Sequence, residues 1–398
     1  MDNCGGLSPR TASSISAWSG GMCGRSALAG ILTRLPILII YLPSHFTGDS
    51  GSWMNPRKEK PMKRAKIPLP VDTSNTGTPW LWIGTWSMGG EGFGPHDERE
   101  SREVLELAVR YGIRHFDTAG LYAHGRSEEL LAKLIGGRRP EFFISTKGGL
   151  LWKGRRVMHD ATPAGLKGQL YKSLRRLKTD YIDLYQLHRP APDVSIRESL
   201  DALKEFKEEG LIRYWGVGNL NPGEVEENLR GERDIPHQVH FNPVHRADDL
   251  LLVGKDSCIN CIISPLEQGL LGNGTSAAGR TALGKRDIRR RNRYFFDEKV
   301  LRWSERLRTM TDACRVPVSV VTLLWIAARP HVHVIIPGPR RTGQVREILQ
   351  FRLMSDEYGR SDGEELKSVL SEDKIRAVIP GDLWDHLNRG PFKEESMK

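Results

Sequence analysis

The sequence predicts a (β/α)8 barrel, in which eight parallel strands form a ring inside a layer of helices. Short apolar runs alternate with stretches of helical apolar spacing from residue 80 onward. Eight such pairs over about 270 residues match the size and alternation of this fold. A doubly wound open sheet shares the alternation, but no run here precedes the glycine-rich fingerprint with which that fold binds dinucleotides. The barrel is therefore the expected fold.

The expected strands are short and apolar, and the expected helices carry an apolar stripe. The first run lies at 80–84, and the first helix follows at 98–111, where Val104, Leu105 and Ala108 recur at helical spacing. The other strands are expected at 113–119, 141–146, 181–187, 212–217, 237–241, 261–266 and 332–336. The other helices are expected at 127–135, 163–178, 196–209, 222–229 and 298–329, with a last helix starting over 343–349.

Composition divides the chain into three parts. Residues 1–61 are rich in Ser and Gly, and their one apolar run, at about a dozen residues, is too short for a membrane span. We expect this N-terminal extension to lie outside the folded core and residues 62–350 to form the barrel. Residues 351–398 are then a C-terminal tail over the barrel mouth, a candidate for closing the pocket with Trp384 and Leu387.

The origin of the extension is open between three interpretations. A Ser- and Arg-rich, acid-poor segment is typical of a transit peptide. A secretory signal is a poorer match because Asp2 and a long polar lead precede the apolar run. Translation from upstream of a true start at Met62 is the interpretation that we favour. The expected location is the cytoplasm, with an organelle as the alternative, and a chain beginning at Met62 is expected to fold.

The net charge of +10 does not predict a nucleic-acid partner. Residues 1–66 hold nine Lys or Arg and three Asp or Glu, so the remaining 332 residues carry only +4, which suits an anionic cofactor. The dense basic run Lys285–Arg293 lacks interleaved aromatic residues, so we interpret it as a clasp over a cofactor or as a solvated loop. Neither a nucleic acid nor a membrane is expected as a partner.

The cysteines predict neither a disulfide framework nor a metal site. There are five at scattered positions, which suits a reducing compartment. Cys258 and Cys261 form a lone C-x2-C pair without a second pair of ligands for zinc, and Cys261 falls in an apolar strand pattern. His331 and His333 stand two apart on an apolar strand, without a third ligand in view.

Polar side chains follow the apolar runs at the ends where such a barrel carries its active site. Asp117 ends the second run with Tyr122 just beyond it, and Lys147 and His188 end the third and fourth runs. Each residue alone has a structural explanation, such as a helix cap for Asp117 or a satisfied core histidine for His188. Their joint placement on successive strands favours a single site.

These four side chains suit the reduction of a carbonyl group. The carbonyl oxygen needs a proton, and a free tyrosine, with a pKa of about 10, is a reluctant donor. A Lys147 ammonium group would lower the pKa of Tyr122, and Asp117 would keep the buried lysine charged. His188 can hold the carbonyl oxygen with a hydrogen bond from its ring. The sequence therefore predicts an Asp117–Lys147–Tyr122 chain.

The motifs that carry these residues resemble those of the aldo-keto reductase family. The segment at 116–122, the strand ends at Lys147 and His188, and the segments at 216–219, 264–270 and 336–341 are similar to family motifs, in the family's order. The resemblance implies a barrel of monomeric type, or a weak oligomer, that binds NADPH without a metal. It also implies that Tyr122, Lys147, Asp117 and His188 are the catalytic positions.

The same resemblance implies the positions that hold the cofactor. They are Asn219, Gln238, Ser264, Leu266, Gln268, Gly338, Arg340, Arg341, Gln344 and Glu347. For Arg340 and Arg341 there is also a direct physical reason, because a guanidinium group binds a 2′-phosphate bidentately. The sequence departs from the family pattern at Gly218, Ile263 and Ile348, where Ser, an aromatic residue and Asn are common.

The expected substrate is a small aldehyde, ketone or sugar. Trp86 and Trp152 are the expected aromatic walls of the pocket. Two other functions stay open at this point. Some family members act as NADPH-sensing regulatory subunits with little turnover. A lyase would use Lys147 to form a Schiff base, which a neighbouring carboxylate disfavours by keeping the lysine protonated.

Overall fold

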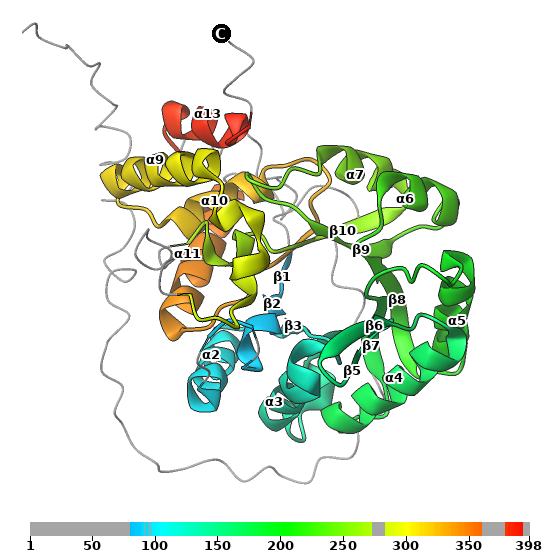
Figure 1. Ribbon diagram of the computed structural model, residues 1–398. Helices are drawn as coiled ribbons and strands as arrows, with labels where there is room; N and C mark the ends of the chain where they lie inside the picture. Colours follow the sequence, from blue (N-terminus) through cyan, green and yellow to red (C-terminus); the bar gives the residue numbers. More distant parts are fainter. Residues whose placement is uncertain (1–79, 91, 95–96, 273–282, 360–378, 393–398) are drawn as a thin grey trace, which may run out of the picture.

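The structure is a computed structural model that describes residues 80–90, 92–94, 97–272, 283–359 and 379–392 (Figure 1). The extension expected at 1–61 and the residues up to 79 lie outside the described residues. Part of the expected C-terminal tail lies outside them as well.

Eight parallel strands form the wall of a barrel, as predicted. The sheet runs in the order β1-β11-β10-β9-β8-β7-β4-β3-β2. The bounds are β1 Trp80–Leu81, β2 Ile83–Gly84, β3 His115–Asp117, β4 Phe143–Gly148, β7 Ile182–Leu187, β8 Ile212–Gly218, β9 Ile235–His240, β10 Cys258–Ile263 and β11 Val334–Ile336. Because β1 and β2 are two halves of one segment, these nine pieces amount to eight strands, and the (β/α)8 prediction is confirmed.

The segment 80–84 closes the ring of strands. Its first half pairs with β11 and its second half with β3, through two residue pairs each. Between the two halves, the amide of Trp82 donates to the carbonyl oxygen of Ile335 at 3.1 Å. All strands are parallel, so their carboxyl ends meet at one mouth of the barrel.

Helices surround the strands in Figure 1. They are α2 Glu98–Arg110, α3 Arg126–Ile135, α4 Pro163–Leu177, α5 Ile196–Glu208, α6 Pro222–Asn228, α7 Asp248–Val253, α9 Glu298–Cys314, α10 Val318–Ala327, α11 Thr342–Gly359 and α13 Gly381–Arg389. The 3-10 turns are η2 Trp86–Met88, η3 Tyr122–Gly125, η4 Arg139–Glu141, η5 Gly254–Asp256, η6 Glu267–Gly269, η7 Ile288–Arg291 and η8 Arg293–Phe295.

Local signals in the sequence set where several helices begin. The carboxylate of Asp97 caps α2 by accepting a hydrogen bond from the amide of Arg99 at 2.8 Å. Thr162 caps α4 directly before a proline, which suits a first helical position because it lacks an amide hydrogen. Asn221 and Glu224 form a reciprocal capping box at the start of α6.

The long helix expected over 298–329 is two helices. Arg315 has a φ of +55° and ends α9, and Pro317 caps α10. The sequence pattern did not mark this break because apolar residues recur from the amphipathic α9 into the wholly apolar α10. Across the described ranges no single helix is long and apolar enough to cross a membrane; α9 and α10 meet that test only together, with a 100° bend between them.

A hairpin that the sequence analysis did not predict follows β4. Its strands β5 Leu150–Lys153 and β6 Arg156–His159 pair antiparallel, outside the barrel sheet. Gly154 turns the hairpin with a φ of +62°, a left-handed value that glycine adopts without steric cost. The side chains of β6 are exposed, so no apolar alternation marked this segment as a strand.

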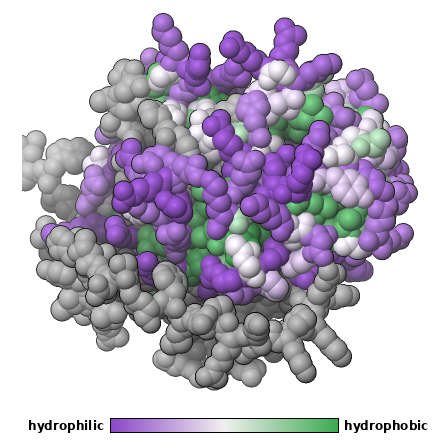
Figure 2. Space-filling view, turned by 90° about the horizontal axis from the view of Figure 1, so that it is seen from below, coloured by the Kyte–Doolittle hydropathy of each residue, from purple (hydrophilic) through white to green (hydrophobic). Residues whose placement is uncertain are grey.

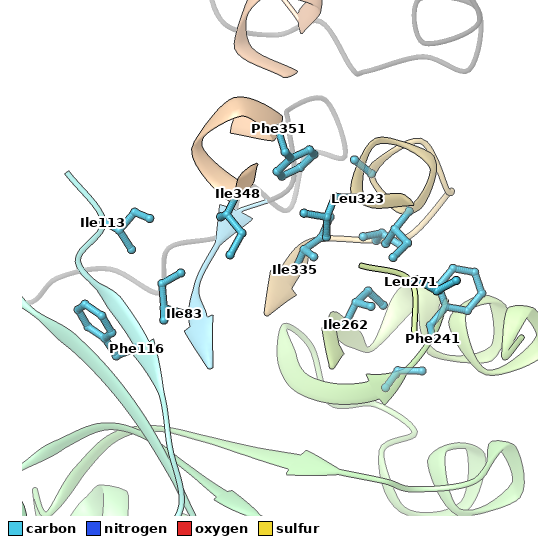
Figure 3. Close-up of a cluster of buried hydrophobic side chains, with 14 of the residues drawn as sticks. Ile83, Ile113, Phe116, Phe241, Ile262, Leu271, Leu323, Ile335, Ile348 and Phe351 are labelled. Atoms are coloured by element: carbon cyan, nitrogen blue, oxygen red, sulfur yellow. The ribbon is translucent and has the colours of Figure 1, made fainter. Parts of the chain in front are cut away.

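The core has an inner and an outer layer. Inside the ring, a small cluster of buried side chains that includes Trp82, Phe143 and Leu184 fills the barrel. The larger outer cluster lies between strands and helices, and Figure 3 shows Ile348 of α11 between Ile83 and Ile335, with Phe351 of the same helix nearer Leu323. Ile348 is buried, which explains an apolar residue at that position.

Trp384 and Leu387, the two apolar candidates of the C-terminal tail, lie in α13, and a pocket-closing role for the tail stays a prediction. Trp384 and Leu387 are fully buried, and α13 packs on α9 and α10. The indole of Trp303 in α9 stacks on His386 at 5.0 Å. These two apolar residues of the tail therefore belong to the outer helix layer. The boundary expected at residue 350 falls inside α11.

Hydrophilic side chains dominate the surface, as Figure 2 shows for one face.

Candidate active site

Asp117, Lys147 and Tyr122 meet at the carboxyl ends of β3 and β4. The Lys147 Nζ donates to Asp117 Oδ2 at 2.6 Å, to the Thr118 carbonyl oxygen at 2.8 Å and to the Tyr122 hydroxyl at 3.2 Å. Asp117 and Lys147 are each 3% exposed. An ammonium group has three hydrogens, so all of them are used. The sequence-predicted chain of three residues is present in the structure.

Burial and the neighbouring charges set the protonation of this cluster. Burial would lower the pKa of Lys147, but the Asp117 carboxylate and the Tyr122 hydroxyl raise it above its ordinary value. For Tyr122 burial raises the pKa, and the Lys147 ammonium only partly opposes that effect. The lysine lowers the pKa of Tyr122, as expected from the sequence, but burial outweighs it. Tyr122 is therefore a protonated phenol at neutral pH.

His188 follows β7 and lies edge-on to the Tyr122 ring, with 5.8 Å between the ring centroids. Burial and the Lys147 charge hold the pKa of His188 well below its usual range, so its imidazole is neutral. Its buried Nδ1 has no hydrogen-bond partner among the described residues. The backbone amide of His188 donates to Gly148 on the neighbouring strand at 2.8 Å, which fixes the ring beside Tyr122.

The second oxygen of the Asp117 carboxylate accepts two hydrogen bonds that were not predicted from the sequence. Its Oδ1 accepts from Ser145 Oγ at 3.0 Å and from Gln238 Nε2 at 2.6 Å. Ser145 in turn accepts from Gln186 Nε2 at 2.7 Å. These residues occupy inward positions on β4, β7 and β9. Polar residues inside otherwise apolar strands were the available signal, and for Gln238 the sequence suggested a cofactor contact instead.

The loop that carries Tyr122 has an unusual backbone. Ala123 and His124 adopt left-handed φ values of +47° and +58°. The guanidinium group of Arg176 lies so close that a Cβ added to Gly120 or Gly125 would collide with it. Arg176 is held by the fully buried carboxylate of Glu128 at 2.5 Å. The Gly120 and Gly125 positions thus keep α4 packed directly against the Tyr122 loop.

Trp86 and Trp152 both lie next to this loop. The Trp86 ring is 6.1 Å from the Tyr122 ring and packs edge-on against Phe93 at 5.0 Å. The Trp152 indole nitrogen donates to the Leu121 carbonyl oxygen at 2.8 Å, and its ring stacks on His124 at 4.6 Å. The unpredicted hairpin β5–β6 therefore braces the Tyr122 loop through Trp152.

Four of the expected cofactor positions lie at the ends of β8 and β10. Asn219 adopts a φ of +60°, and its side-chain amide donates to the His188 carbonyl oxygen at 2.9 Å. Ser264, Leu266 and Gln268 form the turn after β10, where Ser264 and Gln268 also have positive φ values. Gly218, next to Asn219, is tight: an added Cβ would lie 3.1 Å from the His188 carbonyl oxygen, so the space there suits glycine.

Gln238 lies on β9, and five further expected cofactor positions follow β11. Gly338 is exposed and Arg341 is exposed, whereas Arg340 is half-buried and donates to the Phe93 carbonyl oxygen. The Gln344 Oε1 accepts from the amides of Arg340 and Arg341 at 2.7 and 3.2 Å and so shapes the loop. Glu347 accepts a hydrogen bond from Ser319 of α10, which holds its carboxylate toward the helix layer.

The basic run 285–293 lies beside these arginines. Arg289 forms a two-pronged ion pair with Asp287, with a closest distance of 2.6 Å. Burial, and then the positive charges of Arg289 and Arg341, lower the pKa of Arg340. Arg289, Arg340 and Arg341 thus lie at one corner of the barrel mouth, where the carboxylates of Asp287 and Glu100 act on the pKa of Arg340 in the opposite direction. Within the basic run, Arg289 was not distinguishable from its neighbours by sequence alone.

The two cysteines of the C-x2-C pair are buried in and beside the barrel. Burial raises the pKa of Cys258 to about 12 and that of Cys261 well above its usual value, so both are unreactive thiols at neutral pH. Among the described residues, no group of three or more His, Cys, Asp or Glu side chains could hold a metal ion.

Comparison with known proteins identifies the chain's relatives. The sequence model of the Aldo/keto reductase family matches residues 81–363. The NADH-specific methylglyoxal reductase of Escherichia coli (strain K12) is 30% identical over 70% of this chain and 91% of its own length. A probable voltage-gated potassium channel subunit beta of Arabidopsis thaliana is 28% identical over 69% of this chain and 89% of its own.

Solved structures give the same result. The glycerol dehydrogenase from Gluconobacter oxydans superposes with a TM-score of 0.62 at 26% identity, covering 79% of this chain and 94% of that one. The match in sequence spans most of the barrel, and the eight parallel strands agree with it. The chain belongs to the aldo/keto reductase family and is an oxidoreductase of carbonyl and alcohol groups.

Proposed function

We propose that this protein reduces an aldehyde, ketone or sugar carbonyl with NADPH, and that Tyr122 supplies the proton. The buried Asp117–Lys147–Tyr122 cluster beside a neutral His188 carries the proposal. Such a cluster offers a proton donor and a hydrogen-bonding imidazole at one point of the barrel mouth. The same groups serve the reverse oxidation of an alcohol.

The residues at the barrel mouth suit an anionic dinucleotide. Burial lowers the pKa of Arg340 most, and the positive charges of Arg289 and Arg341 lower it further, so these guanidinium groups repel one another. An anion placed among them would relieve that repulsion and accept bidentate hydrogen bonds. At the other end, Asn219 and Gln238 bring amide groups next to the His188 and Asp117 positions. NADPH has phosphates at one end and a carboxamide at the other, and we propose that these two sets hold them.

The bound cofactor would supply the hydride, and the protein's own groups handle the proton. His188 orients the carbonyl oxygen toward the Tyr122 hydroxyl, which transfers its proton as negative charge develops on that oxygen. The Lys147 ammonium then faces a forming phenolate at 3.2 Å and stabilises it. Asp117 keeps Lys147 charged, and Ser145 and Gln238 hold Asp117 in place.

Cofactor choice can be tested at the arginines. Replacing both Arg340 and Arg341 with Ala should weaken NADPH binding by about tenfold or more while changing NADH binding little, because only NADPH carries a 2′-phosphate. Dissociation constants from nicotinamide fluorescence would measure both. The exposed Arg230→Ala variant is the matched control for a lost surface charge. Equal losses for the two cofactors would reject the 2′-phosphate clamp and leave a preference for NADPH over NADH, the cofactor in one relative's name, without support.

The dependence of the rate on pH follows from the two shifted groups. Tyr122 has a raised pKa and stays protonated through neutral pH, and His188 has a lowered pKa and stays neutral there. We therefore expect kcat for carbonyl reduction to be level from about pH 6 to about pH 9 and to fall only as Tyr122 ionises, above about pH 10. Stopped-flow rates of the hydride step at saturating cofactor would measure this. An inflection near pH 7 in that step would contradict the assignment.

The activity itself is tested by a panel of aldehydes, ketones and aldoses, with NADPH consumption followed by absorbance. Turnover of members of the panel supports the reductase. Tight NADPH binding with negligible turnover across the panel would instead favour a regulatory subunit, the role that the name of the Arabidopsis relative suggests for that protein.

A further inference from the structure

Glu267 is an acidic residue buried where the proposed reaction does not use one. It lies in the turn after β10, in an apolar stretch ahead of the buried Leu270 and Leu271, and is 1% exposed. A buried carboxylate is costly unless several hydrogen bonds compensate it. The structure provides them, so the residue needs an explanation of its own.

Three side-chain donors converge on the Glu267 carboxylate. Its Oε2 accepts from Asn242 Nδ2 at 2.7 Å and lies 2.8 Å from His240 Nε2, and its Oε1 accepts from Asn292 Nδ2 at 2.6 Å. Burial opposes ionisation, but these bonds hold the pKa of Glu267 below its ordinary value. The group is thus a carboxylate, and His240 donates to it.

The three donors come from two separate parts of the barrel mouth. His240 is the last residue of β9, and Asn242 follows it in the loop that precedes α7. Asn292 lies between η7 and η8, at the end of the basic run. Asn242 also donates to the Ser264 carbonyl oxygen at 3.0 Å, and Asn292 to Gln268 Oε1 at 3.3 Å. The network therefore reaches two of the proposed cofactor positions directly.

The turn that this network holds is strained. Ser264, Glu267 and Gln268 have φ values of +49°, +43° and +54°. Left-handed backbone at residues other than glycine costs free energy and persists only where the surroundings fix it. The Glu267 carboxylate, from within the turn, connects it to the residues on both sides, alongside the bonds from Asn242 to Ser264 and from Asn292 to Gln268.

The basic run is fixed at its other end as well. The amide of Ile288 donates to the Gly92 carbonyl oxygen at 2.7 Å. An added Cβ on Gly92, whose φ is +80°, would meet the Ile288 side chain at 3.3 Å. The run therefore spans from the loop after β2 to the Glu267 turn, and it carries Arg289 between these two anchors.

We propose that Glu267 is a positioning residue that ties the end of β9, the turn 264–269 and the basic run 285–293 into one preformed cofactor cradle. It acts through the backbone of the turn and through Asn292, without contact to the reacting atoms. The inference rests on the proposed function, because the turn and Arg289 matter only if a dinucleotide binds there.

Glu267→Gln tests the proposal with almost no change in side-chain volume. In the wild type, both oxygens of Glu267 face hydrogen-bond donors. Glutamine replaces one of these oxygens with an NH2 group, so at least one hydrogen bond is replaced by a contact between two donors. We expect the Kd for NADPH to rise about tenfold or more while kcat at saturating NADPH stays within about twofold of the wild type. The exposed Glu106→Gln variant is the control for a lost carboxylate and should bind as the wild type does.

Asn292→Ala separates a positioning role from general stability. It removes the bond from the basic run and leaves His240 and Asn242 on Glu267, so the protein should stay folded if Glu267→Gln does not. A raised Kd for NADPH with a far-ultraviolet circular dichroism spectrum and a Tm close to wild type supports the cradle. A folded Glu267→Gln or Asn292→Ala variant with the wild-type Kd overturns it.

The wild-type measurement distinguishes this inference from the proposed function. If the wild-type protein binds neither NADPH nor NADH in the same fluorescence titration, the proposed function itself fails. If it binds NADPH and the variants bind equally well, only the role of Glu267 is rejected. If the variants lose kcat at saturating NADPH with unchanged Kd, the network serves the reaction centre and the cradle is again rejected.

Discussion

Tyr122→Phe should lower kcat for carbonyl reduction by about two orders of magnitude or more, the usual scale for loss of a general acid. The substitution removes only the hydroxyl that Lys147 contacts at 3.2 Å and keeps the ring that packs near Trp86. NADPH affinity should stay within about twofold, because the proposed phosphate contacts lie elsewhere on the mouth. Steady-state rates and fluorescence titration would measure the two quantities.

The matched control for this prediction is Tyr171→Phe. Tyr171 is 51% exposed on α4, so its hydroxyl can be removed without touching the site, and its variant should turn over as the wild type does. Wild-type turnover by Tyr122→Phe would show that another group supplies the proton. A lowered kcat accompanied by loss of NADPH binding would indicate that the ring positions the cofactor rather than the proton.

Asp117→Asn should both inactivate and destabilise the protein. Lys147 is 3% exposed and loses the carboxylate with which it forms an ion pair, so an unpaired charge is left in the core. Removing one partner of a buried ion pair typically costs about 3–5 kcal/mol of unfolding free energy. Urea unfolding would measure the loss. We expect kcat to fall as well, because burial without Asp117 lowers the pKa of Lys147 and weakens its hold on Tyr122.

Asp193→Asn removes an exposed carboxylate in the loop after β7 and is the control for this second prediction. Its unfolding free energy should stay within about 0.5 kcal/mol of the wild type, as for most surface substitutions. An Asp117→Asn protein as stable as that control would mean that Lys147 is neutral in the folded state, contrary to the pairing described above.

The fold was predictable because the periodic apolar signal was strong. Each expected strand appears within a few residues of its range, and the run at 80–84 was expected as one strand, which it is apart from a break at Trp82. The hairpin at 150–159 was missed because its outer strand is exposed and has no alternation to detect. The break between α9 and α10 was missed because apolar spacing continues across Pro317.

The cluster at the mouth was predictable because its members are polar residues at strand ends, where a core would not place them. The hydrogen bonds between residues on different sides of the barrel could not be predicted from the sequence. Gln238 pairs with Asp117 although 121 positions separate them, and Glu267 finds Asn292 and His240 only once the turns are folded. The net direction of the Tyr122 pKa was out of reach for a related reason: Lys147 lowers it as expected, but burial, which spacing does not show, raises it by more.

The way the ring of strands closes has a mechanical consequence. Two residue pairs on each side hold the segment 80–84 in place, whereas β9 and β10 share six. The segment 80–84 is therefore the most weakly paired part of the wall among these strands. Thermal opening of the barrel should occur there first. Asp117 lies on β3, next to the segment 80–84, and its carboxylate accepts a hydrogen bond from Gln238 of β9 on the opposite side of the barrel. This hydrogen bond ties the two sides of the ring together. A substitution of Asp117 therefore changes the chemistry of the site and the stability of the barrel together, which limits how this residue can vary in evolution.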